Sequence, residues 1–119
     1  MVKQTGAVLH ALFTLADGVS EQEFFPAFEA FYQHLKELGF VHGCRAMRRR
    51  PLEGFGAPLP SFDYHVEFEF LSFEKDQACY DYVKENKEPV QSLHRAMNSK
   101  VRHGSAHFFL TAISDYPDS

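Results

Sequence analysis

The segment YHVEFEF, Tyr64–Phe70, alternates between apolar and polar residues without a break. Its bulky apolar side chains stand at every second position: Tyr64, Val66, Phe68 and Phe70. Between them stand one imidazole and two carboxylates: His65, Glu67 and Glu69. Because successive side chains of a strand point to opposite faces, this pattern predicts a strand with one core face. The polar face needs a separate explanation, which depends on the neighbouring strands.

Three other segments have the composition of strands. The first, Ala7–Leu15 (AVLHALFTL), is apolar and ends just before Asp17-Gly18, which is a turn signal. A second strand is predicted over Cys44–Arg50 and a last one over Ala106–Ile113.

The segment after the Asp-Gly turn has the pattern of an amphipathic helix. Ser20 and Glu23 have the spacing of a capping box, which marks a helix start. Apolar residues then recur at helical spacing: Phe24, Phe28, Phe31, Leu35 and Leu38. Pro26 lies about one turn too deep for this start, so we expect a kink or a later start. Gly39 is placed to end the helix.

A second helix is predicted from about residue 73 to residue 86, with Ser72 as its cap. Pro89 is expected to end or break it, and the apolar spacing over 90–97 indicates a further turn or two. Between the second and third strands, residues 51–63 contain three Pro and two Gly and are predicted as a loop.

The resulting order is β-α-β-β-α-β, the split βαβ arrangement of the ferredoxin-like fold, which belongs to the α+β class. In this topology four antiparallel strands form one sheet in the order 4-1-3-2, so the first strand lies between the third and the fourth. A chain of 119 residues has the size of one domain, and we assign residues 1–119 to a single ferredoxin-like domain.

Both helices of this fold cover the same face of the sheet. The matching face is apolar and is predicted as the main core: Leu9, Ala11, Phe13, Leu15, Val66, Phe68, Phe70, Phe108, Leu110 and Ala112. The opposite face is mixed: Val8, His10, Leu12, Thr14, His65, Glu67, Glu69, His107, Phe109, Thr111 and Ile113. The second strand adds to it either Arg45, Met47 and Arg49 or Ala46, Arg48 and Arg50. Such a face usually meets another subunit or lines a ligand cavity, and we expect both.

The composition restricts the partners. The net charge of −4 argues against a nucleic-acid or anionic-membrane partner, since both require a positive field. RNA recognition on such a sheet also needs aromatic residues on the open face of the third strand, where His65 and two glutamates stand instead. No apolar run approaches the ~18 residues of a membrane span, and we expect a cytoplasmic protein. Cys44 and Cys79 fit no metal-binding spacing and are predicted to be free thiols.

Short motifs along the chain resemble the dimeric α/β-barrel superfamily, which includes the stress-responsive A/B-barrel proteins. They are the Asp17-Gly18 turn, the helix end His34-Leu35-Lys36, the run MRRR…LP.FDYHVEFEF and Asp115-Tyr116-Pro117. More narrowly, they are similar to a functionally uncharacterised bacterial branch of that superfamily. The resemblance implies a homodimer in which two sheets face each other and form a barrel. The mixed face would line its interior, and the loop 51–63 would lie at its mouth.

Polar residues of the mixed face form the candidate site. His10, Glu67 and His107, or His65 in place of one of them, would lie on adjacent strands. Two imidazoles and a carboxylate can bind a divalent metal, and a histidine beside a carboxylate can act as acid or base. The same residues could simply pair across strands in a partly wet interface. We assign the catalytic role to His10, Glu67 and His107, and we assign no metal.

The ligand-binding residues are expected on the same face: His65, Glu69, Arg48, Leu12, Phe109 and Thr111. Arg48, if it points inward, is expected to neutralise Glu67 or Glu69 on the neighbouring strand. The other arginines of its strand are interpreted as a solvated edge that discourages aggregation.

Three functions are compatible with these residues. The first is a homodimeric protein that binds a small, partly apolar molecule in a polar pocket between two sheets. The second, which the resemblance implies, is a cofactor-independent enzyme of the monooxygenase, cyclase or lyase type. His10 or His107 would be its base, with Glu67 orienting the imidazole. The third is a divalent-metal-dependent enzyme, which requires the cluster to close on one ion. No cofactor is assigned.

Overall fold

A computed structural model describes residues 6–52, 54 and 56–112 of the chain. Seven elements follow one another in it: β1 (Ala7–Phe13), α1 (Glu21–Glu37), β2 (Gly43–Arg48), β3 (Tyr64–Phe70), α2 (Phe73–Lys84), α3 (Val90–Asn98) and β4 (His107–Ala112). Ile113 and the motif at 115–117 lie outside the described residues. The predicted ferredoxin-like order is confirmed, with the second helical segment divided into α2 and α3.

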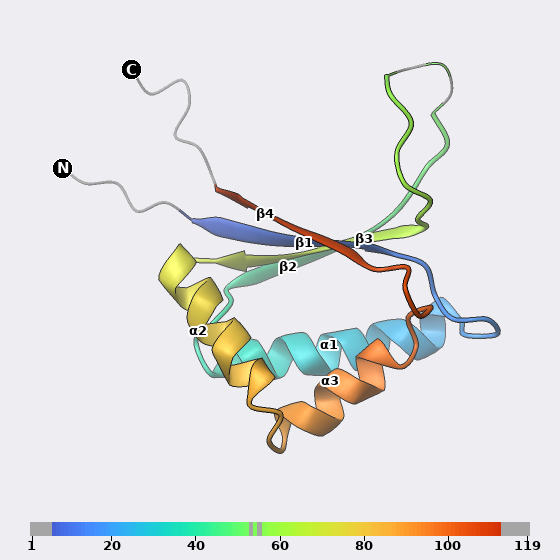
Figure 1. The fold of residues 1–119 in the computed structure, drawn as a ribbon. Coiled ribbons are helices and arrows are strands. Elements are labelled where there is room, and N and C mark those ends of the chain that lie inside the picture. Colours follow the sequence, from blue (N-terminus) through green and yellow to red (C-terminus); the bar gives the residue numbers. More distant parts are fainter. Residues whose placement is uncertain (1–5, 53, 55, 113–119) are drawn as a thin grey trace, which may run out of the picture.

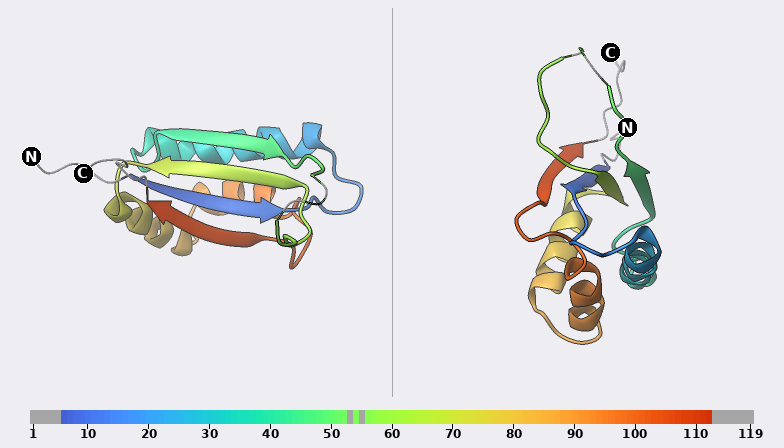
Figure 2. Two further views of the ribbon diagram at one scale, coloured as in Figure 1. Left: turned by 90° about the horizontal axis from the view of Figure 1, so that it is seen from above. Right: turned by 90° about the vertical axis from the view of Figure 1, so that its right-hand side faces the viewer.

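The four strands form one antiparallel sheet in the order β2-β3-β1-β4, which confirms the predicted arrangement (Figure 2). β1 is an interior strand, and its residue His10 has a cross-strand neighbour on each side. These neighbours are Glu67 on β3 and Phe109 on β4. The register therefore brings polar residues that are far apart in the sequence onto one stretch of the sheet.

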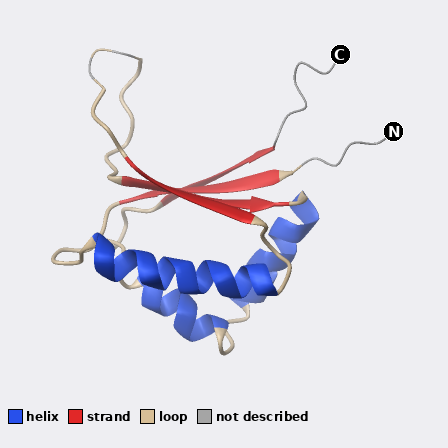
Figure 3. Ribbon diagram, turned by 180° about the vertical axis from the view of Figure 1, so that it is seen from behind, coloured by secondary structure: helices blue, strands red, loops and turns tan. Residues whose placement is uncertain are grey.

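All three helices lie on one side of the sheet, and the opposite side carries no helix (Figures 1 and 3). The loop between β2 and β3 projects beyond the sheet on the side away from the helices (Figure 1). An antiparallel sheet can leave one face uncovered in this way. None of the helices in the described residues is long and apolar enough to cross a membrane.

Helix α1 begins directly after Ser20, as the capping pattern predicts. Glu23 Oε1 accepts a hydrogen bond from the Ser20 backbone N–H at 3.3 Å. Pro26 lies inside the helix, which continues to Glu37. The alternative of a later start is therefore wrong. Pro26 costs the helix one backbone hydrogen bond near its first turns, and the packing of the apolar face outweighs that loss.

Helix α2 starts after Ser72, whose Oγ accepts a hydrogen bond from the Lys75 backbone N–H at 3.2 Å. It ends at Lys84, two residues earlier than predicted, and Asn86 adopts a left-handed backbone conformation with a φ of 57°. Pro89 then precedes α3, so the predicted break at this proline is confirmed.

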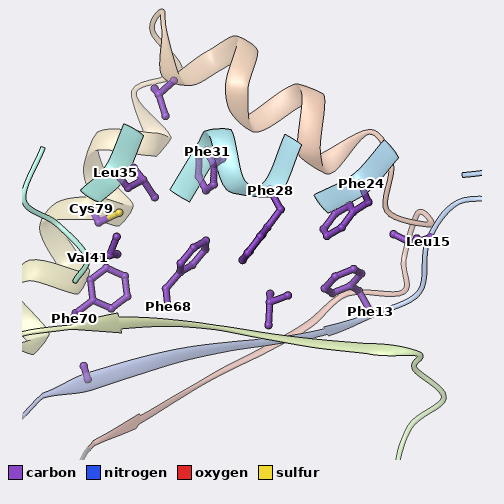
Figure 4. Close-up of a cluster of buried hydrophobic side chains, with 13 residues drawn as sticks. Phe13, Leu15, Phe24, Phe28, Phe31, Leu35, Val41, Phe68, Phe70 and Cys79 are labelled. Atoms are coloured by element: carbon purple, nitrogen blue, oxygen red, sulfur yellow. The ribbon is translucent and has the colours of Figure 1, made fainter. Parts of the chain in front are cut away.

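The core lies between α1 and the helix-facing side of the sheet (Figure 4). Phe24 and Phe28 of α1 are only 1% and 2% exposed. The ring of Phe28 stacks on that of Phe68 with a centroid distance of 5.4 Å. Burial of a phenylalanine side chain contributes about 1.5–3 kcal/mol, so this aromatic layer is the main source of stability.

The edge strand β4 is less buried than the sequence predicts. Phe108 and Leu110 were expected to be buried under the helices, but they are 64% and 42% exposed. Their side chains do belong to the helix-facing side, since Phe108 lines a cavity there together with Phe28. The helices pack against the inner strands more closely than against this edge of the sheet, and β4 is exposed along its length.

Candidate functional site

His10 is the centre of a polar cluster on the face of the sheet that the helices leave uncovered. Its Nδ1 lies 3.0 Å from Nε2 of His65 and 3.3 Å from Oε2 of Glu67. His65 Nε2 lies in turn 3.7 Å from the same Glu67 oxygen. Three polar atoms from two adjacent strands therefore converge on one point. The structure thus brings His65, and not His107 of the assigned catalytic set, into contact with His10 and Glu67.

The imidazole of His10 is held from its other side by β4. Its Nε2 lies 2.8 Å from the hydroxyl oxygen of Thr111. The ring stacks on Phe109 with a centroid distance of 4.3 Å and an interplanar angle of 5°. Contacts to both ring nitrogens and one ring face restrict the orientation of the imidazole. Such restriction is what a catalytic or ligand-binding histidine requires.

Burial controls the protonation of His10, whose side chain is 12% exposed. Burial lowers its pKa from the usual value, the carboxylate of Glu67 acts in the raising direction, and His65 acts in the lowering direction. The ring is therefore neutral at pH 7, with one nitrogen that donates and one that accepts a hydrogen bond. A neutral imidazole can accept a proton or bind a metal.

The second strand presents Arg45, not Arg48, to the cluster. Arg45 is opposite Glu67 in the register, and its Nε lies 3.8 Å from Oε1 of that carboxylate. Its side chain is 72% exposed, so this pair is weak. The sequence does not decide which side of this strand faces inward, because alternation within the strand does not fix its register with the third strand.

The expected pairing of Arg48 with Glu67 or Glu69 is wrong. Arg48 is opposite Tyr64 in the register, which places it on the helix side of the sheet. There its Nε donates to Oε1 of Glu21 at 2.5 Å, and the Tyr64 hydroxyl donates to the same oxygen at 2.9 Å. These bonds hold the pKa of the Glu21 carboxyl at about 2. Arg48 therefore connects the sheet edge to α1 and lies away from the candidate site.

The remaining candidate residues surround the cluster at greater distance. Leu12 lies between His65 and His107 as the cross-strand neighbour of both. In the described part of the chain His107 stays outside the convergent group, on the exposed edge strand. Glu69 lies toward the rim of the sheet, where its Oε1 is 3.3 Å from Nε2 of His42. The side chains of both residues in this second His–Glu pair are about half exposed.

The cavity under the sheet is distinct from this cluster. It has a volume of about 60 Å³ and lies between the sheet and the helices, with Leu9, Phe28, Met97 and Phe108 in its lining. Its walls are almost wholly apolar, so it is a packing space beside the core. The polar cluster instead lies on the open face, and a second surface is needed to enclose it.

Solved structures share this fold across nearly the whole chain. A variant of SnoaB, a cofactor-independent oxygenase from Streptomyces nogalater, is 11% identical with a TM-score of 0.65, covering 98% of this chain and 100% of that one. A dimeric ferredoxin-like protein of unknown function from Thermobifida fusca is 11% identical with a TM-score of 0.57, covering 95% of both chains. A dabb family protein from Mesorhizobium loti is 13% identical with a TM-score of 0.53, covering 93% and 97%. No curated protein matches the chain.

Fold and neighbours define the class of protein. The chain belongs to the class of proteins with a ferredoxin-like fold, a fold that the dimeric ferredoxin-like and dabb proteins above also have. Within this class it belongs to the family of unknown function DUF6614, whose model matches residues 7–119.

Proposed function

We propose that the protein is a homodimer that binds a small, partly apolar molecule in a polar pocket between two facing sheets. The observation that carries this proposal is the convergence of His10, His65 and Glu67 on the uncovered face of the sheet. Polar groups that converge among apolar side chains are typical of ligand sites.

The composition of the uncovered face supports a second subunit above it. Phe109 is 44% exposed in the single chain and lies beside the largely buried His10. Leu12 adds a second apolar side chain to the same face. An aromatic ring that stays in water forgoes the hydrophobic stabilisation of burial, which a facing copy would supply. The fold neighbour from Thermobifida fusca is described as dimeric, which is compatible with this assembly.

The side chains around the cluster define the character of the ligand. Phe109 and Leu12 offer apolar contact, while the imidazoles and Glu67 offer a hydrogen-bond donor and acceptors. The Glu67 carboxylate disfavours a second negative charge close to it. A small aromatic compound with a hydroxyl or carbonyl group fits these features best.

The assembly and the binding are tested separately. Sedimentation equilibrium at micromolar concentration is expected to give twice the chain mass of 13.7 kDa. Phenol and benzaldehyde are then used as probes in thermal denaturation, and both are expected to stabilise the protein. The variants His10→Ala and Glu67→Ala should lose this stabilisation and remain dimers, whereas His42→Ala, in the exposed His–Glu pair, should keep it. A monomer, or loss of the dimer in both cluster variants, would contradict the proposal.

A second candidate function, cofactor-independent acid–base catalysis, is favoured by the orientation of His10. The neutral imidazole lies 3.3 Å from a carboxylate and 2.8 Å from a hydroxyl, an arrangement that orients a general base. The fold neighbour SnoaB is described as a cofactor-independent oxygenase, which is compatible with such chemistry on this fold. In this role His10 would remove a proton from an acidic C–H or O–H group of the ligand, and Glu67 would stabilise the imidazolium formed.

Deuterium exchange into 2-tetralone tests this second function. The ketone has an acidic C–H group beside its carbonyl, and proton NMR in D₂O follows the exchange directly. We expect the protein to accelerate exchange over buffer, the His10→Ala variant to lose the acceleration and His42→Ala to retain it. Equal rates with protein and with buffer would exclude His10 as a base toward this class of compound.

A further inference from the structure

We propose that Nδ1 of His10, Nε2 of His65 and Oε2 of Glu67 are the protein ligands of a divalent transition-metal ion of the zinc type. The three atoms form a triangle with sides of 3.0, 3.3 and 3.7 Å. Ligands that each lie about 2.0–2.1 Å from a tetrahedral zinc ion are separated from one another by about 3.3–3.4 Å. The triangle therefore has the size of one face of a zinc coordination tetrahedron, and it needs only small side-chain movements to accept the ion.

The donor set is suited to such an ion. Two imidazole nitrogens and one carboxylate oxygen are ligands that zinc and other first-row divalent metals bind. Three protein ligands leave at least one coordination position open. Within the described residues, these side chains are the group of three whose ligand atoms all lie within 4.8 Å of one another. The site therefore has the composition of an open metal centre, in contrast to a closed structural one.

Residues next to the triangle support metal binding. Thr111 Oγ1 can accept the N–H of His10 Nε2 at 2.8 Å, which leaves the Nδ1 lone pair directed toward the other two ligands. A hydrogen bond to the second ring nitrogen is the usual partner of a metal-bound histidine. Arg45 approaches Glu67 at Oε1, the oxygen outside the triangle, and leaves Oε2 for the ion. In the metal-free protein His65 can donate its Nε2–H to the same Nδ1 lone pair at 3.0 Å, and the ion would take the place of that hydrogen bond.

A second His–Glu pair in the same chain serves as a comparison for the proposed metal site. His42 Nε2 and Glu69 Oε1 also lie 3.3 Å apart, where His42 directly precedes β2, but their side chains are 45% and 44% exposed. One imidazole and one carboxylate in this exposed position provide only two ligands. The His42 pair therefore controls for non-specific binding of metal to surface histidines.

The open coordination position also affects how the small pocket molecule binds. This step rests on the function proposed above. A pocket molecule with a hydroxyl or carbonyl oxygen could coordinate the ion there, so metal and organic ligand would bind cooperatively. With the ion bound, Nδ1 of His10 is no longer free to act as a base. Metal binding and metal-free proton abstraction by His10 are thus alternative uses of the same atom.

The experiment uses untagged full-length protein that has been treated with EDTA and desalted. Isothermal titration with ZnCl₂ is expected to show one ion per chain with a dissociation constant of micromolar or lower. His65→Ala and Glu67→Gln should each weaken binding at least tenfold, and His42→Ala should leave it unchanged. Co²⁺ is expected to give the intense visible absorption of a four-coordinate site. Circular dichroism confirms that the variants fold, and Glu67→Gln retains the shape of the side chain.

Two results would overturn the metal site. One is the absence of a stoichiometric ion in the wild-type titration. The other is equal affinity in the wild type and in Glu67→Gln and His65→Ala. The function proposed above is tested apart from this, by thermal denaturation with phenol and benzaldehyde in the presence of EDTA. Stabilisation by the probes without zinc binding overturns the metal site alone, and zinc binding without any stabilisation by the probes overturns the binding function alone.

Discussion

His10 and Glu67 are cross-strand neighbours on β1 and β3, and their side chains meet with 3.3 Å between Nδ1 and Oε2. The two residues are separated by about half of the chain, so only the sheet register brings them together. Their pairing explains why a strand with an apolar core face carries a carboxylate at this position. Because the two side chains are in direct contact, the interaction free energy of the pair can be measured by mutating each residue singly and both together.

The His10–Glu67 pair is expected to contribute to folding stability. A double-mutant cycle with His10→Ala and Glu67→Ala should give a coupling free energy of about 0.5–1 kcal/mol, because the pair is partly buried and directly opposed. Urea denaturation of the metal-free protein at pH 7 measures it. The matched cycle for His42 and Glu69 should give about 0–0.5 kcal/mol, since both side chains are about half exposed. Equal couplings would show that burial of the first pair has no energetic consequence.

Phe28→Ala is expected to destabilise the protein by about 3–5 kcal/mol, because it removes a buried ring and leaves a cavity. Phe28 is 2% exposed and stacks on Phe68. Urea denaturation followed by circular dichroism measures the loss. Tyr80→Ala on α2, where the side chain is 61% exposed, should change stability by less than about 0.5 kcal/mol. A similar cost for both variants would mean that α1 does not form the main core.

The contact of Glu21 with Arg48 and Tyr64 predicts a dependence of stability on acid pH. These hydrogen bonds lower the pKa of Glu21 from 4.5 to about 2 in the folded protein. In this range the unfolded chain binds more protons than the folded one, so the stabilisation is present above pH 4.5 and is lost as the pH falls toward 2.

Glu21→Gln should therefore lower the urea midpoint at pH 7, and its difference from the wild type should shrink between pH 5 and pH 2 as the carboxylate is neutralised. Glu37→Gln, at the exposed end of α1, serves as the control and should leave the acid sensitivity unchanged. A constant difference between Glu21→Gln and the wild type across this range would contradict the assigned contact.

Phe109→Asp is expected to weaken the proposed homodimer at least tenfold. In the single chain Phe109 is 44% exposed, so a carboxylate there is tolerated by the monomer. In the dimer it would be buried without a partner, which is costly. Sedimentation equilibrium measures the dissociation constant, and Tyr80→Asp on the helical side is the control. An unchanged dimer in Phe109→Asp would place the interface elsewhere on the molecule.

The sequence predicted the elements whose signals are local. Ser20 and Ser72 marked the starts of α1 and α2, and the alternation over Tyr64–Phe70 marked β3 with its core face. The ferredoxin-like strand order followed from the succession of these elements. Pro26 does not delay the start of α1, because a single proline costs less than the burial of the phenylalanine stripe contributes.

The sequence predicted which face of the sheet carries the candidate site, but it did not predict which residues on that face are in contact. Alternation placed His10, His65 and Glu67 on the same side of the sheet, which the register confirms. It did not decide between His65 and His107, or between Arg45 and Arg48. Those choices depend on side-chain direction and on the register between β2 and β3. Because a loop of more than ten residues connects these two strands, local rules do not determine that register. Periodicity likewise could not predict the exposure of Phe108, because that exposure depends on how closely the helices pack against β4.

The sequence by itself thus determined which residues form strands and helices and which side of each strand is apolar, because these properties follow from steric preferences and periodicity within a few residues. Only the tertiary structure decided that one nitrogen of His10 meets both His65 and Glu67, and that Arg48 turns to Glu21 instead. The physical reason is that a register shift of one residue reverses the facing of a whole strand at little local cost. The register is set by the packing of the entire sheet against its helices.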